Sequence, residues 1–360
     1  YIYQAEGIDS LRNYVLSLNK LEFDLEKSYL DGILVDSVFT ETNRLKTWLG
    51  KFDKEDYTYT ALLPDNNAWN EQYAKILNLY KTLEVDGGVK AQVSNTKWVL
   101  VRDLFYKGLI AAPIAMDTLY STYGNGFTNP AELFANAQLY ANSNGATYIT
   151  SSLKFKSVEA YLKPIVIEAE NSAYGRTARN YELSNYSSYG TGYNISNRFY
   201  LNAKATSSLS TAQLTINFPI PNTLSAKYNV YCVFVPNYIT DTTNVKPYKI
   251  KFSVNTDYDD VKAGRDSVWA SADNNAVLAA NQAGTFTTDP KKITKMLVLK
   301  NYSFPFANLY SLYNQKDMVY GNKIRVGLRV LNAAGTTVME KINFSRDIRI
   351  DYILLEPVIE

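Results

Sequence analysis

The change of hydrophobic pattern at Lys163-Pro164 constrains the fold of this chain more than any other feature. Before this point apolar residues recur at helical spacing, and after it they form short runs separated by turn residues. Short runs at close intervals are typical of a β-sandwich or jelly roll. The predicted strands are Ile165–Ala169, Phe199–Ala203, Gln213–Phe218, Tyr228–Val235, Tyr248–Val254, Lys295–Leu299, Lys323–Leu331 and Ile348–Leu355.

The chain has 360 residues, which is enough for two domains with separate cores. We expect an α+β domain over residues 1–163 and an all-β domain over residues 164–360. Tyr228–Val235 is apolar on both faces, so we expect this strand in the interior of a sheet.

The stretch Tyr57–Ile76 is the most informative part of the first domain. Its aromatic and β-branched residues predict a strand that Pro64 ends, because proline has no N–H to donate. Asp65 follows at the position of a helix cap, and Trp69 begins an apolar face at helical spacing. Further elements are predicted as helices at Asp9–Asn19, Asp24–Phe39, Asn43–Trp48, Asn95–Lys107 and Pro130–Asn142, and as a strand at Ser143–Ile149.

Residues Thr60–Trp69, TALLPDNNAW, resemble the first signature of the fasciclin domain, in which a strand runs through proline into a helix. Ser143–Ile149, SNGATYI, resembles the closing strand of the same family. The resemblance implies a fasciclin-like α+β fold for residues 1–163. The chain departs from the family at its histidines, since Leu104–Lys107 stands where the family carries a tyrosine-histidine pair.

The absence of histidine removes several classes of chemistry. No Ser-His-Asp or Cys-His arrangement can form, and metal sites that need imidazole are excluded. Cys232 is the one cysteine, so it has no internal disulfide partner, and its apolar surroundings predict a small buried side chain. Lys plus Arg at 37 against Asp plus Glu at 35 gives a net charge of +2, so no nucleic-acid partner is expected.

Tyrosine is unusually frequent, with 30 residues in the chain. Tyrosine-rich surfaces are typical of proteins that hold sugars or other proteins outside the cell, because the ring stacks while its hydroxyl hydrogen-bonds. No apolar run in the sequence reaches membrane-spanning length. No signal peptide can be read from Tyr1 onward.

Both ends of the second half resemble the family 6 carbohydrate-binding modules and their galactose-binding-like relatives. Ile167–Asn171, IEAEN, is similar to the first strand of these modules, and Ile350–Ile353, IDYI, is similar to the last. The resemblance implies a galactose-binding-like jelly roll over residues 164–360 with a carbohydrate ligand. Residues 255–321 have no counterpart in it and are interpreted as added loops.

In those modules a glutamate of the first strand and the aspartate of the last strand often hold a structural calcium ion. The resemblance therefore implies Ca²⁺ at Glu168 or Glu170 together with Asp351. Carboxylates from two strand ends need a cation or an arginine beside them, so ion pairing with arginine is the alternative. The arginines considered for this pairing are Arg176, Arg346 and Arg349.

The same resemblance implies a sugar cleft lined by aromatic side chains. The loop after the first strand supplies Tyr186, Tyr189 and Tyr193, and Trp269 supplies a further aromatic residue. An asparagine just before the last I-D-Y completes the cleft in the family, and Arg349 takes its place here. The alternative is that these tyrosines are turn residues that pack on their own sheet.

A fasciclin-like domain followed by such a sandwich is similar to the surface lipoproteins that accompany outer-membrane nutrient importers. This implies a non-catalytic accessory protein that binds a glycan or peptide, docks on transporter components and is anchored by lipid on the extracellular face of the outer membrane. A fasciclin-type cell or matrix adhesion protein is the alternative. A glycosidase that uses Glu168 and Asp351 is the third hypothesis.

Overall fold

The computed structural model describes residue 2 and residues 5–111, 113–208, 213–240, 242–243, 245–256, 267–277 and 279–359. The chain forms two compact units. The first unit consists of Tyr1–Tyr80, Lys90–Lys163 and Lys316–Val319. The second unit consists of Lys81–Val89, Pro164–Gln315 and Tyr320–Glu360.

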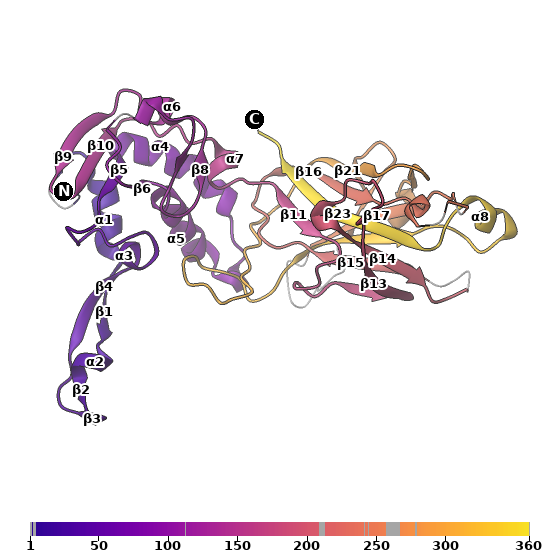
Figure 1. Cartoon of the computed structure of the whole chain (residues 1–360), viewed down its shortest axis with the longest axis horizontal. Coiled ribbons are helices and arrows are strands. Elements are labelled where there is room, and N and C mark those ends of the chain that lie inside the picture. The colour runs from indigo at the N-terminus through magenta and orange to yellow at the C-terminus, as the bar shows by residue number, and fades with distance from the viewer. Residues whose placement is uncertain are drawn as a thin grey trace. The chain divides into compact units, whose positions relative to one another are not determined.

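The first unit is built on a four-stranded sheet in the order β6-β5-β10-β9. The two stretches with fasciclin-like sequence, β5 (Tyr59–Pro64) and β10 (Gly145–Thr150), are neighbouring parallel strands of this sheet (Figure 1). Asp65 accepts a hydrogen bond of 2.8 Å from the backbone N–H of Ala68 and caps α4 (Asn66–Leu77), as predicted. The strand, proline, cap and helix of this stretch are confirmed.

Other helices of this unit are α1 (Asp9–Ser17), α2 (Leu25–Ser28), α3 (Arg44–Trp48), α5 (Gly88–Val101), α6 (Pro130–Leu133) and α7 (Ser157–Ala160). Its remaining strands are β1 (Asn19–Phe23), β2 (Tyr29–Leu30), β3 (Ile33–Leu34), β4 (Phe39–Asn43), β6 (Phe105–Lys107), β7 (Leu119–Tyr120), β8 (Gly126–Phe127) and β9 (Gln138–Asn142).

The predicted helix at Asp24–Phe39 is wrong. Only the single turn α2 is helical, and the chain then forms the antiparallel β2–β3 hairpin. Asp31 and Gly32 connect the two strands with φ values of 49° and 80°. Two successive left-handed residues make the tight turn that fits the twist of a hairpin, and an Asp-Gly pair adopts it at low cost.

Two other predicted helices extend too far toward the C-terminus. The one at Asn95–Lys107 corresponds to α5, which ends at Val101, and Phe105–Lys107 form β6 on the edge of β5. The one at Pro130–Asn142 corresponds to α6 alone. Asn136 follows with a φ of 60°, and Gln138–Asn142 form β9, antiparallel to β10. In both cases pairing with the sheet outweighs helical propensity.

The second unit is a β-sandwich, and all eight predicted strands are present. One sheet has six strands, β13-β14-β23-β16-β21 with β11 paired to β23, and the other has seven, β12-β15-β22-β17-β18-β19 with β20 paired to β17. Their bounds are β11 Ile165–Glu168, β12 Thr177–Arg179, β13 Tyr181–Ser187, β14 Phe199–Ala205, β15 Leu214–Pro219, β16 Lys227–Phe234, β17 Lys249–Thr256, β18 Ser267–Ala270, β19 Ala276–Val277, β20 Phe286–Thr287, β21 Thr294–Ser303, β22 Val326–Asn332 and β23 Ile348–Pro357, with the helix α8 at Val338–Asn343.

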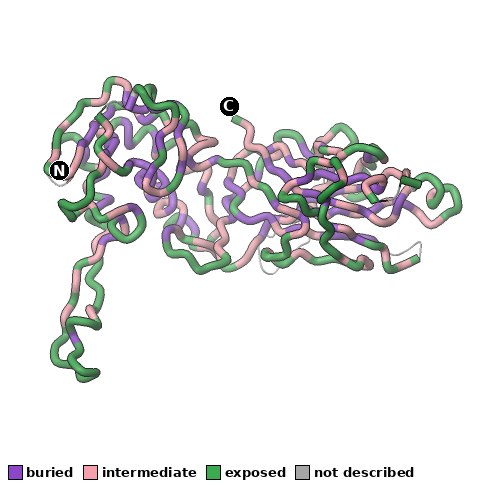
Figure 2. Tube along the Cα trace, viewed as in Figure 1, coloured by how far each residue is buried: buried purple, intermediate pink, exposed green. Residues whose placement is uncertain are grey.

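The two sheets enclose an aromatic and aliphatic core, visible as buried segments in Figure 2. Phe234 of β16 packs against Phe252 of β17 and against Tyr248, with ring centroids 6.2 Å and 5.9 Å apart. The strand β16 lies between β23 and β21, which confirms its predicted interior place. Cys232 of this strand is fully buried, and burial raises the pKa of its thiol well above the usual value.

A buried ion pair fixes the segment Lys81–Val89 within the second unit. The Arg325 side chain is fully buried, and its guanidinium meets Asp86 at 2.6 Å and 3.0 Å, one nitrogen to each carboxylate oxygen. The Asp86 side chain is also buried, at 7% exposure. A two-point contact of this kind compensates both charges for the loss of water.

We expect Asp86→Ala to lower the free energy of unfolding of the second unit by about 3–5 kcal/mol, because Arg325 would stay buried without this carboxylate. Chemical denaturation followed by tryptophan fluorescence measures the change. Glu84→Ala is the matched control, since Glu84 is an exposed acidic residue in the same segment. Equal stability of the two variants would contradict a structural role for the pair.

Candidate binding site

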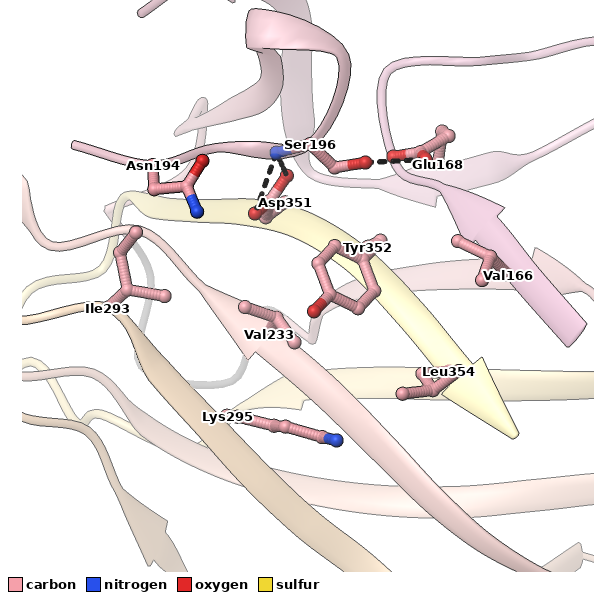
Figure 3. A pocket seen from close by; sticks show the side chains of 10 residues that line it. All are labelled: Val166, Glu168, Asn194, Ser196, Val233, Ile293, Lys295, Asp351, Tyr352 and Leu354. Carbon is pink, nitrogen blue, oxygen red and sulfur yellow. Dashed lines mark hydrogen bonds between the residues drawn. The ribbon is translucent and has the colours of Figure 1, made fainter. Parts of the chain in front are cut away.

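A pocket lies on the outer face of the six-stranded sheet. The pairing of β11 with β23 places Ile167 and Ile353 toward the core, so Val166 and Leu354 point to the opposite side, where the pocket lies. Its cavity volume is about 490 Å³. Figure 3 shows the lining side chains, which are Val166, Glu168, Asn194, Ser196, Val233, Ile293, Lys295, Asp351, Tyr352 and Leu354.

A β-bulge brings Asp351 and Tyr352 into this pocket together. Between β16 and β23, Cys232 pairs with Ile353 and Phe234 pairs with Ile350, so two residues of β23 lie opposite Val233 alone. In a regular strand neighbouring side chains point to opposite faces, and a bulge locally cancels this alternation. The acidic and the aromatic side chain therefore share one site.

Ser196 connects the two acidic residues that line the pocket. Its backbone N–H donates to both carboxylate oxygens of Asp351, at 3.1 Å and 3.3 Å. Its hydroxyl donates to Oε1 of Glu168 at 2.7 Å. Figure 3 shows Ser196 between the two carboxyl groups. The residue thus holds the end of β11 and the start of β23 in one hydrogen-bonded arrangement.

Two carboxyl groups at this junction, Asp351 and Glu170, have raised pKa values. Burial raises the pKa of Asp351 to about 7, and the charges of Glu168 and Glu170 add to this rise, while the Ser196 N–H opposes it. Burial also raises the pKa of Glu170, with a further contribution from Glu168. The charge of Glu168 therefore makes ionisation of both Asp351 and Glu170 harder.

Arginine does not neutralise these groups through a direct ion pair with Arg176 or Arg349. Arg176 donates to the backbone oxygen of Ala169, and Arg349 donates to Asn237 and, at 2.8 Å, to the Thr240 hydroxyl. Arg176 still lowers the pKa of Glu170 through its charge, which is the weakest contribution to that pKa.

The donor atoms match a hard cation in chemical type. Oε2 of Glu168 and Oε2 of Glu170 are buried without a hydrogen-bond partner. Yet within the described ranges no three acidic, cysteine or histidine side chains gather as a ready metal-binding cluster. Ca²⁺ takes six to eight oxygen ligands, so a calcium ion would need oxygens beyond these carboxylates.

The rest of the pocket combines an aliphatic surface with polar groups. Val166, Val233, Ile293 and Leu354 supply the aliphatic part. Lys295 is held by Glu356 at 2.7 Å and lies 4.2 Å from the centre of the Tyr231 ring. Carboxylate, amide, hydroxyl and ammonium groups next to an aliphatic floor suit a small ligand rich in hydroxyl groups.

The tyrosines predicted for the sugar cleft do not line this pocket. Tyr186 stacks on Tyr200, with ring centroids 6.0 Å apart and an interplanar angle of 20°. Tyr193 packs on the small cluster that contains Ile195, and its hydroxyl donates to the Lys291 carbonyl at 2.9 Å. Tyr189 is 83% exposed. Two of the three thus pack on their own sheet and loops.

Trp269 and Arg349 are also separate from the pocket. Trp269 belongs to β18 of the seven-stranded sheet, whereas the tyrosines and Arg349 belong to the six-stranded sheet and its loops. Arg349 and the Tyr248 hydroxyl both hydrogen-bond to Asn237, so Arg349 holds the segment that follows β16. The structure therefore does not join Trp269 to the other predicted ligand residues.

Asn194, Ser196, Lys295 and Tyr352 were not among the predicted site residues. The only sequence signal for them was proximity to a motif, because Asn194 follows Tyr193 directly and Tyr352 belongs to the I-D-Y run. Lys295 reaches the pocket through the pairing of β21 with β16, where it lies opposite Val233.

We expect Asp351→Asn to remove a pH-dependent loss of stability. The folded pKa of about 7 lies above the ordinary aspartate pKa of 3.8, so wild-type stability falls as pH rises from about 4 to 7. Asparagine does not ionise and still offers an oxygen to the Ser196 N–H. In EDTA, the unfolding temperature of the variant should rise relative to that of the wild type as the pH increases toward 7.

The matched control is Glu182→Gln, which changes an exposed acidic residue on β13. The difference in unfolding temperature between Asp351→Asn and the wild type should change with pH. A constant difference from about pH 4 to pH 8 would contradict the raised pKa of Asp351.

No protein-family model matches the sequence, and no curated protein is detectably similar to it. Solved structures similar to part of the chain include an exo-beta-1,3-galactanase from Phanerochaete chrysosporium, with 13% identity and a TM-score of 0.22 over 54% of this chain and 29% of that one. A family 35 carbohydrate binding module from Clostridium thermocellum has 15% identity and a TM-score of 0.24 over 53% of this chain and 96% of the module.

A Paenibacillus xanthan lyase has 14% identity and a TM-score of 0.31, over 70% of this chain and 18% of the lyase. The chain thus spans less than a third of the galactanase and less than a fifth of the lyase. Identities and TM-scores of this size leave the function of the chain to be argued from its own residues.

Proposed function

We propose that the chain is a non-catalytic accessory protein that binds a glycan in the pocket on the six-stranded sheet. The observation that carries this proposal is the combination of Asn194, Tyr352 and Lys295 with an aliphatic floor. Amide, phenol and ammonium groups hydrogen-bond to sugar hydroxyls, and apolar surface covers the C–H face of a sugar ring. The resemblance of both ends of the sandwich to carbohydrate-binding modules supports the same ligand class.

Glycoside hydrolysis is the second candidate, because a carboxyl group with a pKa of about 7 beside another carboxyl group is a typical acid-base pair. The arrangement of Ser196 argues against it. Both oxygens of Asp351 and one oxygen of Glu168 accept bonds from this single residue, which occupies the space between them. A scissile bond would have to occupy that space.

A calcium ion is part of the proposal. It would be held by Glu168, Glu170 and Asp351 together with further oxygens, and it would supply the positive charge that these carboxyl groups lack. Its role would be structural: it would hold the first and last strands of the sandwich together and keep the pocket wall in place.

We further propose that the protein works at the cell surface, docked on an outer-membrane import complex and attached through a lipid anchor upstream of Tyr1. The pairing of a fasciclin-like domain with a sugar-module-like sandwich supports this setting. An adhesion protein of the fasciclin type is the alternative. No helix in the described part of the chain is long and apolar enough to cross a membrane.

We expect Asn194→Ala and Tyr352→Ala to weaken glycan binding by roughly tenfold each, because both remove groups that line the pocket. Binding is measured on a glycan array and then by calorimetry with the best ligand. Tyr313→Ala is the control, since Tyr313 is an 83% exposed tyrosine of the same unit outside the pocket.

Loss of binding in Tyr189→Ala, with full binding in the pocket variants, would move the site to the tyrosine loop. If the wild type releases sugar from a glycan and Glu168→Gln or Asp351→Asn does not, the protein is a glycosidase and the binding proposal is wrong. If the protein binds no glycan on the array, the adhesion hypothesis is favoured.

A further inference from the structure

A hairpin extends from the first unit, and we call residues Asn19–Asn43 the arm. Its base is the antiparallel pair β1 and β4, and its tip holds α2 and the β2–β3 hairpin. Figure 1 shows the arm reaching away from α1, α3 and the four-stranded sheet of its unit. Figure 2 shows that nearly all of it is exposed or half-buried.

One face of the arm's base carries its apolar side chains, together with Glu41 opposite Leu21 and Asn19 opposite Asn43, and the other face is polar. Phe23 pairs with Phe39 across the ladder, and Leu21 lies two residues before Phe23 on the same face. The two phenylalanine rings are 5.6 Å apart in an edge-to-face contact. The opposite face carries Lys20, Glu22, Thr40 and Thr42. This alternation is normal for a ribbon that covers a core, but here the apolar face has no core beneath it.

Apolar side chains are exposed on the tip as well. Leu21 is 72% exposed and Ile33 is 68% exposed. The main exposed apolar side chains are Leu21, Leu25, Leu30, Ile33, Val35 and Phe39. On these six residues the exposed fractions add up to roughly 800 Å², which matches the contribution of about 800 Å² from one partner in a standard protein interface and exceeds the largest patch of about 300–600 Å² on a typical monomer. The arm alone therefore offers enough surface for a stable interface.

The arm is also acidic. It contains six acidic residues and two lysines, a net charge of −4, while the whole chain carries +2, so the remaining residues carry +6. The acidic residues are Glu22, Asp24, Glu26, Asp31, Asp36 and Glu41. Lys27 forms an ion pair with Asp24 at 2.8 Å, and this pair is the only one among the arm residues that the structure describes. The surplus negative charge thus surrounds the apolar surface.

We propose that the arm docks into an apolar groove, rimmed by lysine and arginine, on a partner protein. The groove would bury the apolar side chains and the rim would pair with the acidic ones. Two arms would repel each other through their like charge, which disfavours arm-to-arm pairing of two copies. An anionic lipid surface would repel the arm in the same way. This inference rests on the proposed accessory function and assigns its docking element.

The partner is found by photocrosslinking in native membranes. A benzoyl-phenylalanine at Tyr29, which is 42% exposed at the tip, should cross-link to a protein whose mapped peptide lies in an apolar groove with basic residues at its rim. Cross-links to a second copy of this chain, to lipid, or to a surface without basic residues would each overturn the proposal.

The purified partner then allows a matched comparison. Leu30→Ser with Ile33→Ser should weaken binding at least about tenfold, while Val338→Ser with Ile342→Ser on α8 should leave it within about twofold. All four side chains are more than half exposed, so both variants should unfold at the wild-type temperature. Raised salt should slow association about tenfold and leave dissociation nearly unchanged.

Equal binding by the two variants would overturn the arm as the docking element. Glycan binding by the arm variant is measured in parallel and should match the wild type, because the arm and the pocket belong to different units. Failure of the arm proposal would thus be distinguishable from failure of the glycan proposal, which affects binding in wild type and arm variant alike.

Discussion

The pairing of β11 with β23 is the interaction on which the second unit depends. It joins the first and last strands of the sandwich in one sheet, with Ile165 opposite Leu355 and Glu168 opposite Tyr352. The core gains Ile167 and Ile353 from it, and the outer face gains the wall of the pocket. The same pairing brings the buried Asp351 of one strand end near the half-buried Glu168 of the other. Folding of the sandwich and the chemistry of its pocket are therefore coupled.

That coupling has an electrostatic cost, which ordinary hydrogen bonds offset only in part. Ser196 satisfies Asp351 and one oxygen of Glu168, but a hydrogen bond compensates less than the full desolvation of a charge. A pKa of about 7 means that Asp351 is close to half protonated near neutral pH. A proton relieves this cost at Asp351, and the proposed calcium ion would also meet the oxygens of Glu168 and Glu170 that have no hydrogen-bond partner.

How much of the fold could be predicted from sequence depended on how local the signal was. The eight predicted strands of the sandwich are short apolar runs bounded by turn residues. β13 escaped prediction because most of its side chains are exposed and polar, so no alternation marks it. The Asp24–Phe39 error arose because apolar residues at helical spacing also occur in a hairpin, and the Asp31-Gly32 turn was the stronger signal.

The site was predictable only where a motif carried it. Glu168 and Asp351 were found from the two strand motifs, and the structure brings both into the pocket. Lys295 needed the strand register, and the shared placement of Asp351 with Tyr352 needed a bulge that breaks the two-residue alternation. Trp269 was assigned to the same cleft as the tyrosines because sequence order does not say which sheet a strand joins.

The most direct measurement of the central claim is the titration of the Asp351 carboxyl group by carbon NMR of protein labelled at aspartate, with Asp351→Asn for assignment. The account predicts a midpoint near pH 7 in EDTA and a lower midpoint when calcium is added, because the cation favours the ionised form. A midpoint near the ordinary aspartate value of 3.8 that calcium does not change would contradict it.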